Sequence, residues 1–251
     1  DLDLPLDLPL NESPHLHALL NNQAFYDVVY LAPPPLQGTQ DPRMANFLQH
    51  LGSRIKHFVY ISTSGVYGDC GGAWIDETAP IKPRTPRAAR RADAEHQLQA
   101  WTTLTQGKLG ILRVPGIYGL DRLPLKRLQA GTPIVCAQDS PFTNRIHVAD
   151  LANACLVLLE ALQTQKSPSG EAYNACDGQP SSMYDYFTRC AAYFGLPQPA
   201  EISLTQARST LSPELLSYYD ESKRLKNDKL LRLGWVPQYI HLADFLSRAG
   251  H

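Results

Sequence analysis

Short apolar runs alternate with stretches of helical hydrophobic spacing over the first two thirds of this sequence. The apolar runs lie at 27–32, 57–62 and 110–114. The stretches with helical spacing lie at 42–51, 86–102 and 149–162. Runs that are apolar on both faces are typical of a parallel sheet covered by helices. The alternation therefore predicts an α/β fold with a doubly wound parallel sheet, whose ligands bind at the carboxyl ends of the strands.

The pattern changes after Gly170. The rest of the sequence predicts a short strand at 172–174, a helix at 183–194, a polar loop and a second helix at 222–233. We therefore expect a larger domain at 1–165 and a small C-terminal domain at 166–251, to which 120–142 also contributes.

Charge and cysteine content limit the classes of partner. The 251 residues carry 23 Lys and Arg against 24 Asp and Glu, a net charge of -1, which gives no overall attraction for nucleic acid or an anionic membrane. The longest apolar run, 152–159, is far shorter than the roughly 20 residues of a membrane span. Five cysteines without a C-x-x-C pair fit neither a disulfide framework nor a zinc site. Together with the lack of a signal peptide, this favours a cytoplasmic protein with a small-molecule substrate.

A glycine triplet in the spacing G-x-x-G-x-x-G follows the second predicted strand, at Gly65, Gly68 and Gly71. A phosphate-binding loop of this kind must open a helix whose N-terminus faces the phosphates. Residues 72–80, GAWIDETAP, cannot begin a helix. We therefore reject the triplet as a dinucleotide fingerprint.

Motifs in a fixed order nevertheless resemble a known family. They are VYISTSGVYG at 59–68, DETAP at 76–80, RVPGIYG at 113–119, RIHVADLA at 145–152, Tyr173-Asn174, and 223–235 with its closing LGW. This order resembles the NAD-dependent epimerase/dehydratase family of extended short-chain dehydrogenases/reductases, over essentially the whole chain. The resemblance implies a Rossmann-type NAD(P)-binding domain with a small substrate domain. A homodimer is one assembly that we expect.

The family's first strand, glycine-rich turn and second strand have no counterpart here. Asp1 and Leu2 match the end of the family's third strand. The resemblance therefore implies that these two residues contact the cofactor. We expect a truncation rather than a degenerate fragment. Without the turn, NAD or NADP binding should be weak or lost, and NADP is slightly favoured over NAD.

Family chemistry uses a Ser or Thr hydroxyl and a Tyr with a Lys four residues later, so that a helix places Tyr and Lys on one face. Counting back from Glu95, these two positions fall on Arg87 and Arg91, while Thr63 keeps the hydroxyl. Asp41 matches an Asn of the family. Because Arg does not deprotonate in the working range, the pattern resembles the atypical subgroup that retains the fold and loses the catalytic tetrad.

The resemblance assigns further contacts. The cofactor would touch Ala32, Pro33, Ile61, Ser62, Arg91, Pro115, Gly116 and Ile117. The substrate would touch Ser64, Tyr67 and Arg145.

Plainer explanations stay open for several of these residues. A solvated basic face explains Arg84, Arg87, Arg90 and Arg91 as well as anion recognition does. Strand packing and a helix cap at Asp150 can explain the segment of Arg145 and His147. Tyr67 and Tyr118 could replace the missing phenol, or simply pack. His15 and His17 have the spacing of two metal ligands on a strand, but they lie in a helical pattern, and a structural pair is favoured.

We thus expect an NAD(P)-dependent epimerase/dehydratase-like or reductase-like protein that acts on a sugar nucleotide or similar polar metabolite, with a degenerate Y-x-x-x-K site. A catalytically impaired NAD(P)-binding sensor or scaffold is the alternative. A third interpretation is that the fragment binds nothing tightly.

Overall fold

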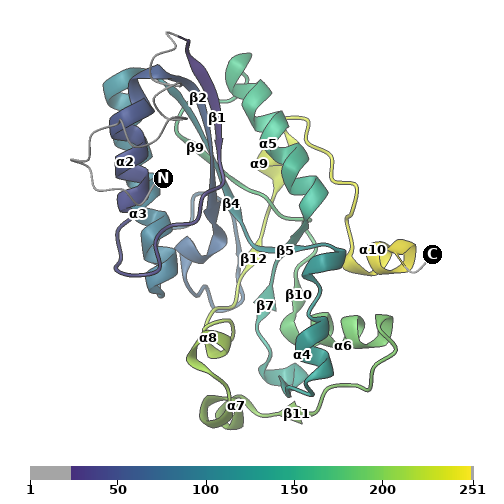
Figure 1. Cartoon of the computed structure of the whole chain (residues 1–251). Coiled ribbons are helices and arrows are strands. Elements are labelled where there is room, and N and C mark those ends of the chain that lie inside the picture. The colour runs from purple at the N-terminus through teal and green to yellow at the C-terminus, as the bar shows by residue number, and fades with distance from the viewer. Residues whose placement is uncertain (1–23, 250–251) are drawn as a thin grey trace. The chain divides into compact units, whose positions relative to one another are not determined.

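The computed structural model of the chain describes residues 24–249 (Figure 1). The chain divides into two compact units. Unit 1 holds the described residues up to Val66, Ile81–Arg113 and Cys155–Tyr173, and unit 2 holds Tyr67–Pro80, Val114–Ala154 and the residues from Asn174 onward. The units interleave along the chain, because loops that follow the strands belong to the same unit as the C-terminal third.

Unit 1 is built on a four-stranded sheet in the order β1-β2-β4-β9. Its strands are β1 (Tyr26–Tyr30), β2 (Ile55–Thr63), β4 (Lys108–Val114) and β9 (Glu171–Asn174). β1 and β2 run parallel, with Tyr30 opposite Tyr60. Helices α2 (Pro42–Leu51) and α3 (Pro86–Thr105) cover one face of the sheet, and α5 (Val148–Gln163) lies on the other (Figure 1). The predicted doubly wound α/β fold is confirmed.

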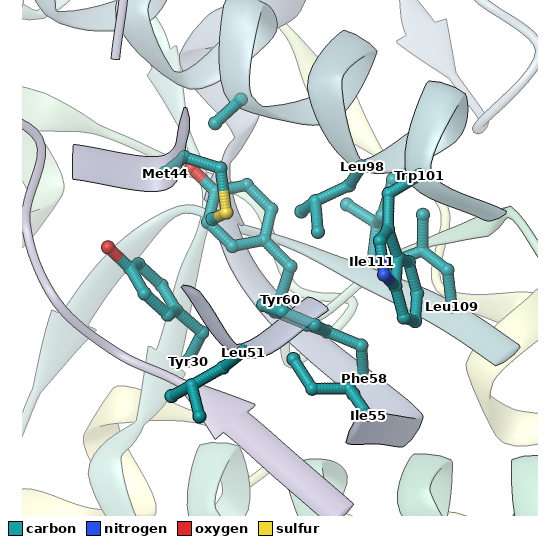
Figure 2. Packing of buried hydrophobic residues seen from close by; sticks show 11 residues of the cluster. Tyr30, Met44, Leu51, Ile55, Phe58, Tyr60, Leu98, Trp101, Leu109 and Ile111 are labelled. Carbon is teal, nitrogen blue, oxygen red and sulfur yellow. The ribbon is translucent and has the colours of Figure 1, made fainter. Parts of the chain in front are cut away.

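The residues of β4 separate the two layers of unit 1. Leu109 and Ile111 point into a buried cluster with Tyr60, Leu98 and Trp101 (Figure 2). Gly110, between them, points the other way, and a Cβ atom there would lie 2.8 Å from Leu158 of α5. Alternate residues of one strand thus pack against helices on both faces, as the apolar run predicts.

Gly52 directly follows α2, whose last residue is Leu51. Its φ of -55° is right-handed, and the chain continues into a 3-10 turn at Gly52–Arg54. A Cβ atom would lie 3.2 Å from the ring of Trp101, whose Nε1 donates a hydrogen bond to the Gly52 carbonyl oxygen. The glycine therefore makes room for an indole.

Unit 2 contains short paired strands. They are β3 (Trp74–Ile75) with β12 (Arg224–Leu225), β5 (Gly116–Tyr118) with β8 (Arg145–His147), β6 (Ile134–Val135) with β11 (Glu201–Ile202), and β7 (Phe142–Thr143) with β10 (Ser181–Ser182). Its helices are α4 (Leu125–Gln129), α6 (Met183–Tyr193), α7 (Leu204–Thr210), α8 (Pro213–Leu216), α9 (Asp228–Leu231) and α10 (Leu242–Ala249). Two apolar clusters join them, one around Phe187 and one around Phe245.

Two predictions for the C-terminal third were wrong. The expected helix at 222–233 is instead β12 followed by the short α9, because Arg224 and Leu225 pair with β3. The expected polar loop contains β11, α7 and α8. None of the helices within 24–249 has the length and apolar character that a membrane crossing requires.

Candidate functional site

The carboxyl ends of β1 and β2 lie side by side because the two strands are parallel neighbours. Ala32 and Pro33 follow β1, while Ile61, Ser62 and Thr63 close β2. We call this set the strand-end edge. Ligands of open parallel sheets bind at such an edge.

Arg91 reaches the strand-end edge from α3. Its Nη1 donates hydrogen bonds to the carbonyl oxygens of Ala32 (3.3 Å) and Ile61 (3.0 Å) and to the hydroxyl of Tyr60 (3.2 Å). The guanidinium also lies 5.7 Å from the centroid of the Tyr60 ring. All the hydrogen bonds of Arg91 within 24–249 start from Nη1. The side chain thus bridges two strands and keeps Nε and Nη2 as donors.

Thr63 presents a hydroxyl at the same edge. It is half-buried, and its Oγ1 accepts a hydrogen bond from the Gly65 amide at 3.2 Å. The Thr63 hydroxyl group can therefore still donate a hydrogen bond to a ligand. Within 24–249, Thr63 and Arg91 form no direct hydrogen bond with each other.

The other arginines of α3 have different surroundings. Arg90 is buried, and its Nη1 donates to the Gly38 carbonyl oxygen at 2.7 Å, which anchors the loop after β1. Arg84 and Arg87 are exposed. Arg87 shares a helix face with Arg91 through the four-residue spacing. The four arginines are therefore not a uniform solvated face.

Ser62, Glu95 and Arg113 form a buried network beneath the strand-end edge. The Ser62 hydroxyl donates to Glu95 at 2.5 Å, and Arg113 Nη2 lies 2.8 Å from the same carboxylate. The network ties β2, α3 and β4 together. The Ser62 side chain is thus engaged within the protein.

Asp41 is a fully buried carboxylate beside the same helix. Its Oδ1 accepts from the Met44 amide at 3.2 Å and caps α2, while Oδ2 and the hydroxyl of Tyr30 are buried without a partner among the described residues. Burial raises the pKa of Asp41 above its ordinary value, and the nearby charge of Arg91 partly offsets this. Burial also raises the pKa of Tyr60, to about 12.

Unit 2 holds the other predicted contacts. Pro115 precedes β5, which contains Gly116 and Ile117, and the Gly116 amide donates to the Asn144 carbonyl oxygen. Arg145, on the paired β8, is buried.

The Arg145 side chain is engaged within unit 2. Its Nη1 donates to the Ser181 hydroxyl at 2.9 Å, and the guanidinium lies 3.8 Å from the centroid of the Tyr186 ring. Burial lowers the pKa of Arg145 and raises that of the neighbouring Asp177 to about 7.

The two tyrosines that could replace the missing phenol are both packed within unit 2. The Tyr67 hydroxyl donates to Asn174 Oδ1 at 2.8 Å, and the Tyr118 hydroxyl donates to the Tyr239 carbonyl oxygen at 3.3 Å. Burial raises the pKa of Tyr118 far above its ordinary value. These contacts favour packing for both side chains.

His147 stacks on Tyr239 with ring centroids 3.9 Å apart, and its Nδ1 accepts from the Ala149 amide. Asp150 does not cap α5 as expected. Its two carboxylate oxygens accept from the amides of Gln238 and Tyr239 instead.

The glycine-rich segment forms turns. Buried Ser64 begins a 3-10 turn at Ser64–Tyr67, and Gly71 and Gly72 follow with φ of +58° and +75°. The next regular element is β3, so the rejection of the triplet as a helix-opening phosphate loop is confirmed.

Asp1, Leu2, His15 and His17 lie outside the described residues. Within 24–249 the structure has no His, Cys, Asp and Glu group that could hold a metal ion. All five cysteines are free thiols.

Sequence reasoning missed the Ser62–Glu95–Arg113 network and the buried charge of Asp41. In the sequence analysis, Glu95 served only to count back to the Tyr and Lys positions. A carboxylate on the apolar face of a helix also predicts that a cation or hydrogen-bond donor is buried beside it. The partner could not be read from sequence, because it lies on a different strand.

Comparisons with known proteins agree with these observations. The profile of the NAD dependent epimerase/dehydratase family matches residues 43–176, more than half of the chain. Human dTDP-D-glucose 4,6-dehydratase is 28% identical over 130 residues, which are 49% of this chain and 36% of that protein. This chain therefore spans only about a third of that relative's length.

Solved structures give the same result. A functionally unknown conserved protein from Silicibacter pomeroyi is 31% identical with a TM-score of 0.73, over 87% of this chain and 75% of that one. A double mutant of DesIV, a dTDP-glucose 4,6-dehydratase from Streptomyces venezuelae with NAD and DAU bound, shares the fold at 18% identity and a TM-score of 0.73, over 94% and 74% of the two chains. The profile match over more than half of the chain leads to one conclusion: the chain belongs to the NAD-dependent epimerase/dehydratase family.

Proposed function

We propose that this chain is part of an NAD(P)-dependent epimerase/dehydratase-like or reductase-like protein that acts on a sugar nucleotide or a similar polar metabolite. Family membership supports the reaction class. The dehydratase names of the relatives, and the NAD in one of their structures, support the cofactor and the substrate class.

The observation that carries the proposal is the position of Arg91. A cation on α3 lies across the carboxyl ends of two parallel strands, with Nε and Nη2 unused by any described residue. Donors at this edge fit the hydroxyl or phosphate oxygens of a dinucleotide. On the unit 1 side, we assign the cofactor to Ala32, Pro33, Ile61, Ser62 and Arg91.

The bound nicotinamide would supply the hydride chemistry. The residues of this chain would do something different from a Tyr–Lys pair, because arginine is not a general acid or base in the ordinary sense. We propose that they bind and orient an anionic group, either carboxylate or phosphate. The Thr63 hydroxyl would donate a hydrogen bond to a ligand oxygen.

Further contacts follow from the family match in unit 2. We propose Pro115, Gly116 and Ile117 for the cofactor. For the substrate we propose Tyr67 and Arg145, together with Ser64 of unit 1. Because the side chains of Tyr67 and Arg145 are engaged within unit 2, they would shape the site rather than donate freely to a ligand.

A catalytically impaired sensor or scaffold is the second candidate. It is favoured by the packing of Tyr67 and Tyr118, because neither phenol is placed to replace the missing acid/base group.

Conversion of the sugar nucleotide, measured by chromatography together with reduced-nicotinamide absorbance, separates the two candidates, because an epimerisation or a dehydration leaves the dinucleotide with no net change of oxidation state. The full-length protein is mixed with NAD or NADP and a panel of sugar nucleotides, and turnover is followed over time. Turnover supports the enzyme, and binding without turnover supports the sensor. A protein that binds neither dinucleotide contradicts both. We also predict a slight preference for NADP and weak dinucleotide binding by the 251 residues alone. Parallel titrations with NAD and with NADP measure both.

A further inference from the structure

Residues 221–226, which we call the clamp segment, are hydrogen-bonded at several points to residues 67–73, which we call the tyrosine loop. Both belong to unit 2. The Ser222 carbonyl oxygen accepts from the Cys70 amide at 3.1 Å and from the Gly72 amide at 2.9 Å. The pairing of β12 with β3 continues the contact beyond the loop. The backbone of the clamp segment therefore runs along the tyrosine loop and binds it.

Lys223 of the clamp segment donates directly to the backbone of the tyrosine loop. Its side chain is 7% exposed, and Nζ lies 2.6 Å from the Gly68 carbonyl oxygen and 2.6 Å from Glu221 Oε2. Gly68 has φ of +66°, in the left-handed region that glycine favours. An ammonium group is costly to bury, and its counter-charge Glu221 belongs to the clamp segment itself. The hydrogen bond from Nζ to Gly68 is thus the contact through which Lys223 holds the loop.

Tyr67, the neighbour of Gly68, is tied to the clamp segment a second time through Asn174. The Tyr67 hydroxyl donates to Asn174 Oδ1 at 2.8 Å, and Asn174 Nδ2 donates to the Lys226 carbonyl oxygen at 3.0 Å. The Asn174 amide donates to Glu77 Oε1 at 2.7 Å, which fixes Asn174 itself. The backbone beside Tyr67 and the hydroxyl at the end of its side chain therefore both depend on the clamp segment.

We propose that Lys223 is a positioning residue for the substrate: its buried ammonium group holds the Gly68 carbonyl oxygen, and with it Tyr67, in the conformation that receives a sugar nucleotide. The inference deepens the proposed function and rests on the assignment of Tyr67 to the substrate. Lys223 acts through the tyrosine loop. Because the cofactor is assigned to other residues, loss of the contact weakens substrate binding and leaves dinucleotide binding unchanged.

Two variants isolate the hydrogen bond between Lys223 and Gly68. Glu221→Gln removes the ion pair but keeps an acceptor for Nζ, and it is the matched control. The double variant Glu221→Gln, Lys223→Met removes the ammonium group as well, without leaving a buried carboxylate unpaired. Methionine fills the space with a flexible apolar chain. Circular dichroism and urea unfolding check the fold of both variants.

Two measurements on the full-length protein report on the loop and on the substrate. The rate at which iodoacetamide alkylates Cys70, followed by mass spectrometry, reports how often the tyrosine loop opens, because Cys70 lies in the loop and its amide binds Ser222. Calorimetry measures the affinities for dTDP-glucose and UDP-glucose, and separately those for NAD and NADP.

The double variant should differ from Glu221→Gln by about tenfold in both readouts, the effect of one charge-assisted hydrogen bond at the low end of its usual strength. Cys70 should react faster, and the sugar nucleotide should bind more weakly. The affinity for NAD or NADP should stay the same. A purely structural role for Lys223 would instead lower the urea midpoint and leave the ratio of the two affinities unchanged.

Equal Cys70 rates in the double variant and the control overturn the inference, and so do equal sugar-nucleotide affinities. A parallel loss of dinucleotide affinity also overturns it. If the parent binds neither sugar nucleotide, the proposed substrate class fails, and the inference falls with it. Should the double variant not fold, Glu221→Gln, Lys223→Gln decides by the same criteria, because two amides can pair in place of the two charges while the ammonium group is lost.

Discussion

Glu95→Ala removes the carboxylate through which α3 binds Ser62 of β2 and Arg113 of β4. The side chains of Arg113 and Glu95 are 8% and 3% exposed, so the variant removes a buried negative charge that pairs with Arg113. Breaking such a pair from one side costs about 3–5 kcal/mol. The Ser62 hydroxyl also loses its acceptor, which adds about 1 kcal/mol.

Urea unfolding followed by circular dichroism measures this loss. We expect the free energy of unfolding to fall by about 4 kcal/mol at an unchanged m value, with Tm lower by roughly 10 °C. Arg208→Gln is the matched control. Arg208 and Asp220 form an ion pair whose side chains are 62% and 49% exposed, so its loss should cost less than about 1 kcal/mol. A loss below 1 kcal/mol for Glu95→Ala would refute the reasoning.

Three further predictions follow from local geometry. Gly110→Ala should lower the free energy of unfolding by about 1–3 kcal/mol in urea, because the new methyl would lie 2.8 Å from Leu158. Iodoacetamide labelling, read by mass spectrometry, should modify half-buried Cys70 first, since burial protects the other thiols and raises the pKa of Cys176 to about 12. Asp177 has a pKa raised from 3.8 to about 7, so the folded state holds its proton more tightly; the free energy of unfolding should decrease as pH rises from about 4 to 7, and Asp177→Asn should flatten that slope.

Local signals were sufficient for the elements of unit 1. The helix at Pro42–Leu51 has the predicted bounds, because Pro42 favours the first turn and the apolar spacing continues to Leu51. The role of Gly52 was not readable. It depends on Trp101, which follows about fifty positions later and packs against the glycine only in the fold.

The C-terminal third shows where local signals fail. Leu230 and Leu233 lie three residues apart, as on one face of a helix, but the chain at Arg224–Leu225 pairs with a strand about 150 residues earlier. Long-range pairing prevailed over local periodicity there.

The candidate site was predictable only in part. The four-residue spacing placed Arg87 and Arg91 on one face of α3. The carbonyl oxygens that Arg91 binds, at Ala32 and Ile61, come from two strands and needed the structure. The buried charge of Asp41 needed it too, because burial is set by the packing of α2 against α3.

The central claim is that the Arg87 and Arg91 positions recognise an anion in place of acid/base chemistry. The most direct measurement is sulfate affinity, with reductase turnover, in the full-length protein and in its Arg87→Tyr, Arg91→Lys double variant. The account predicts weaker sulfate binding, by about 1.5–3 kcal/mol for the one charged group that Arg87→Tyr removes, and no loss of turnover. Unchanged sulfate affinity, or a large loss of turnover in the double variant, would contradict it.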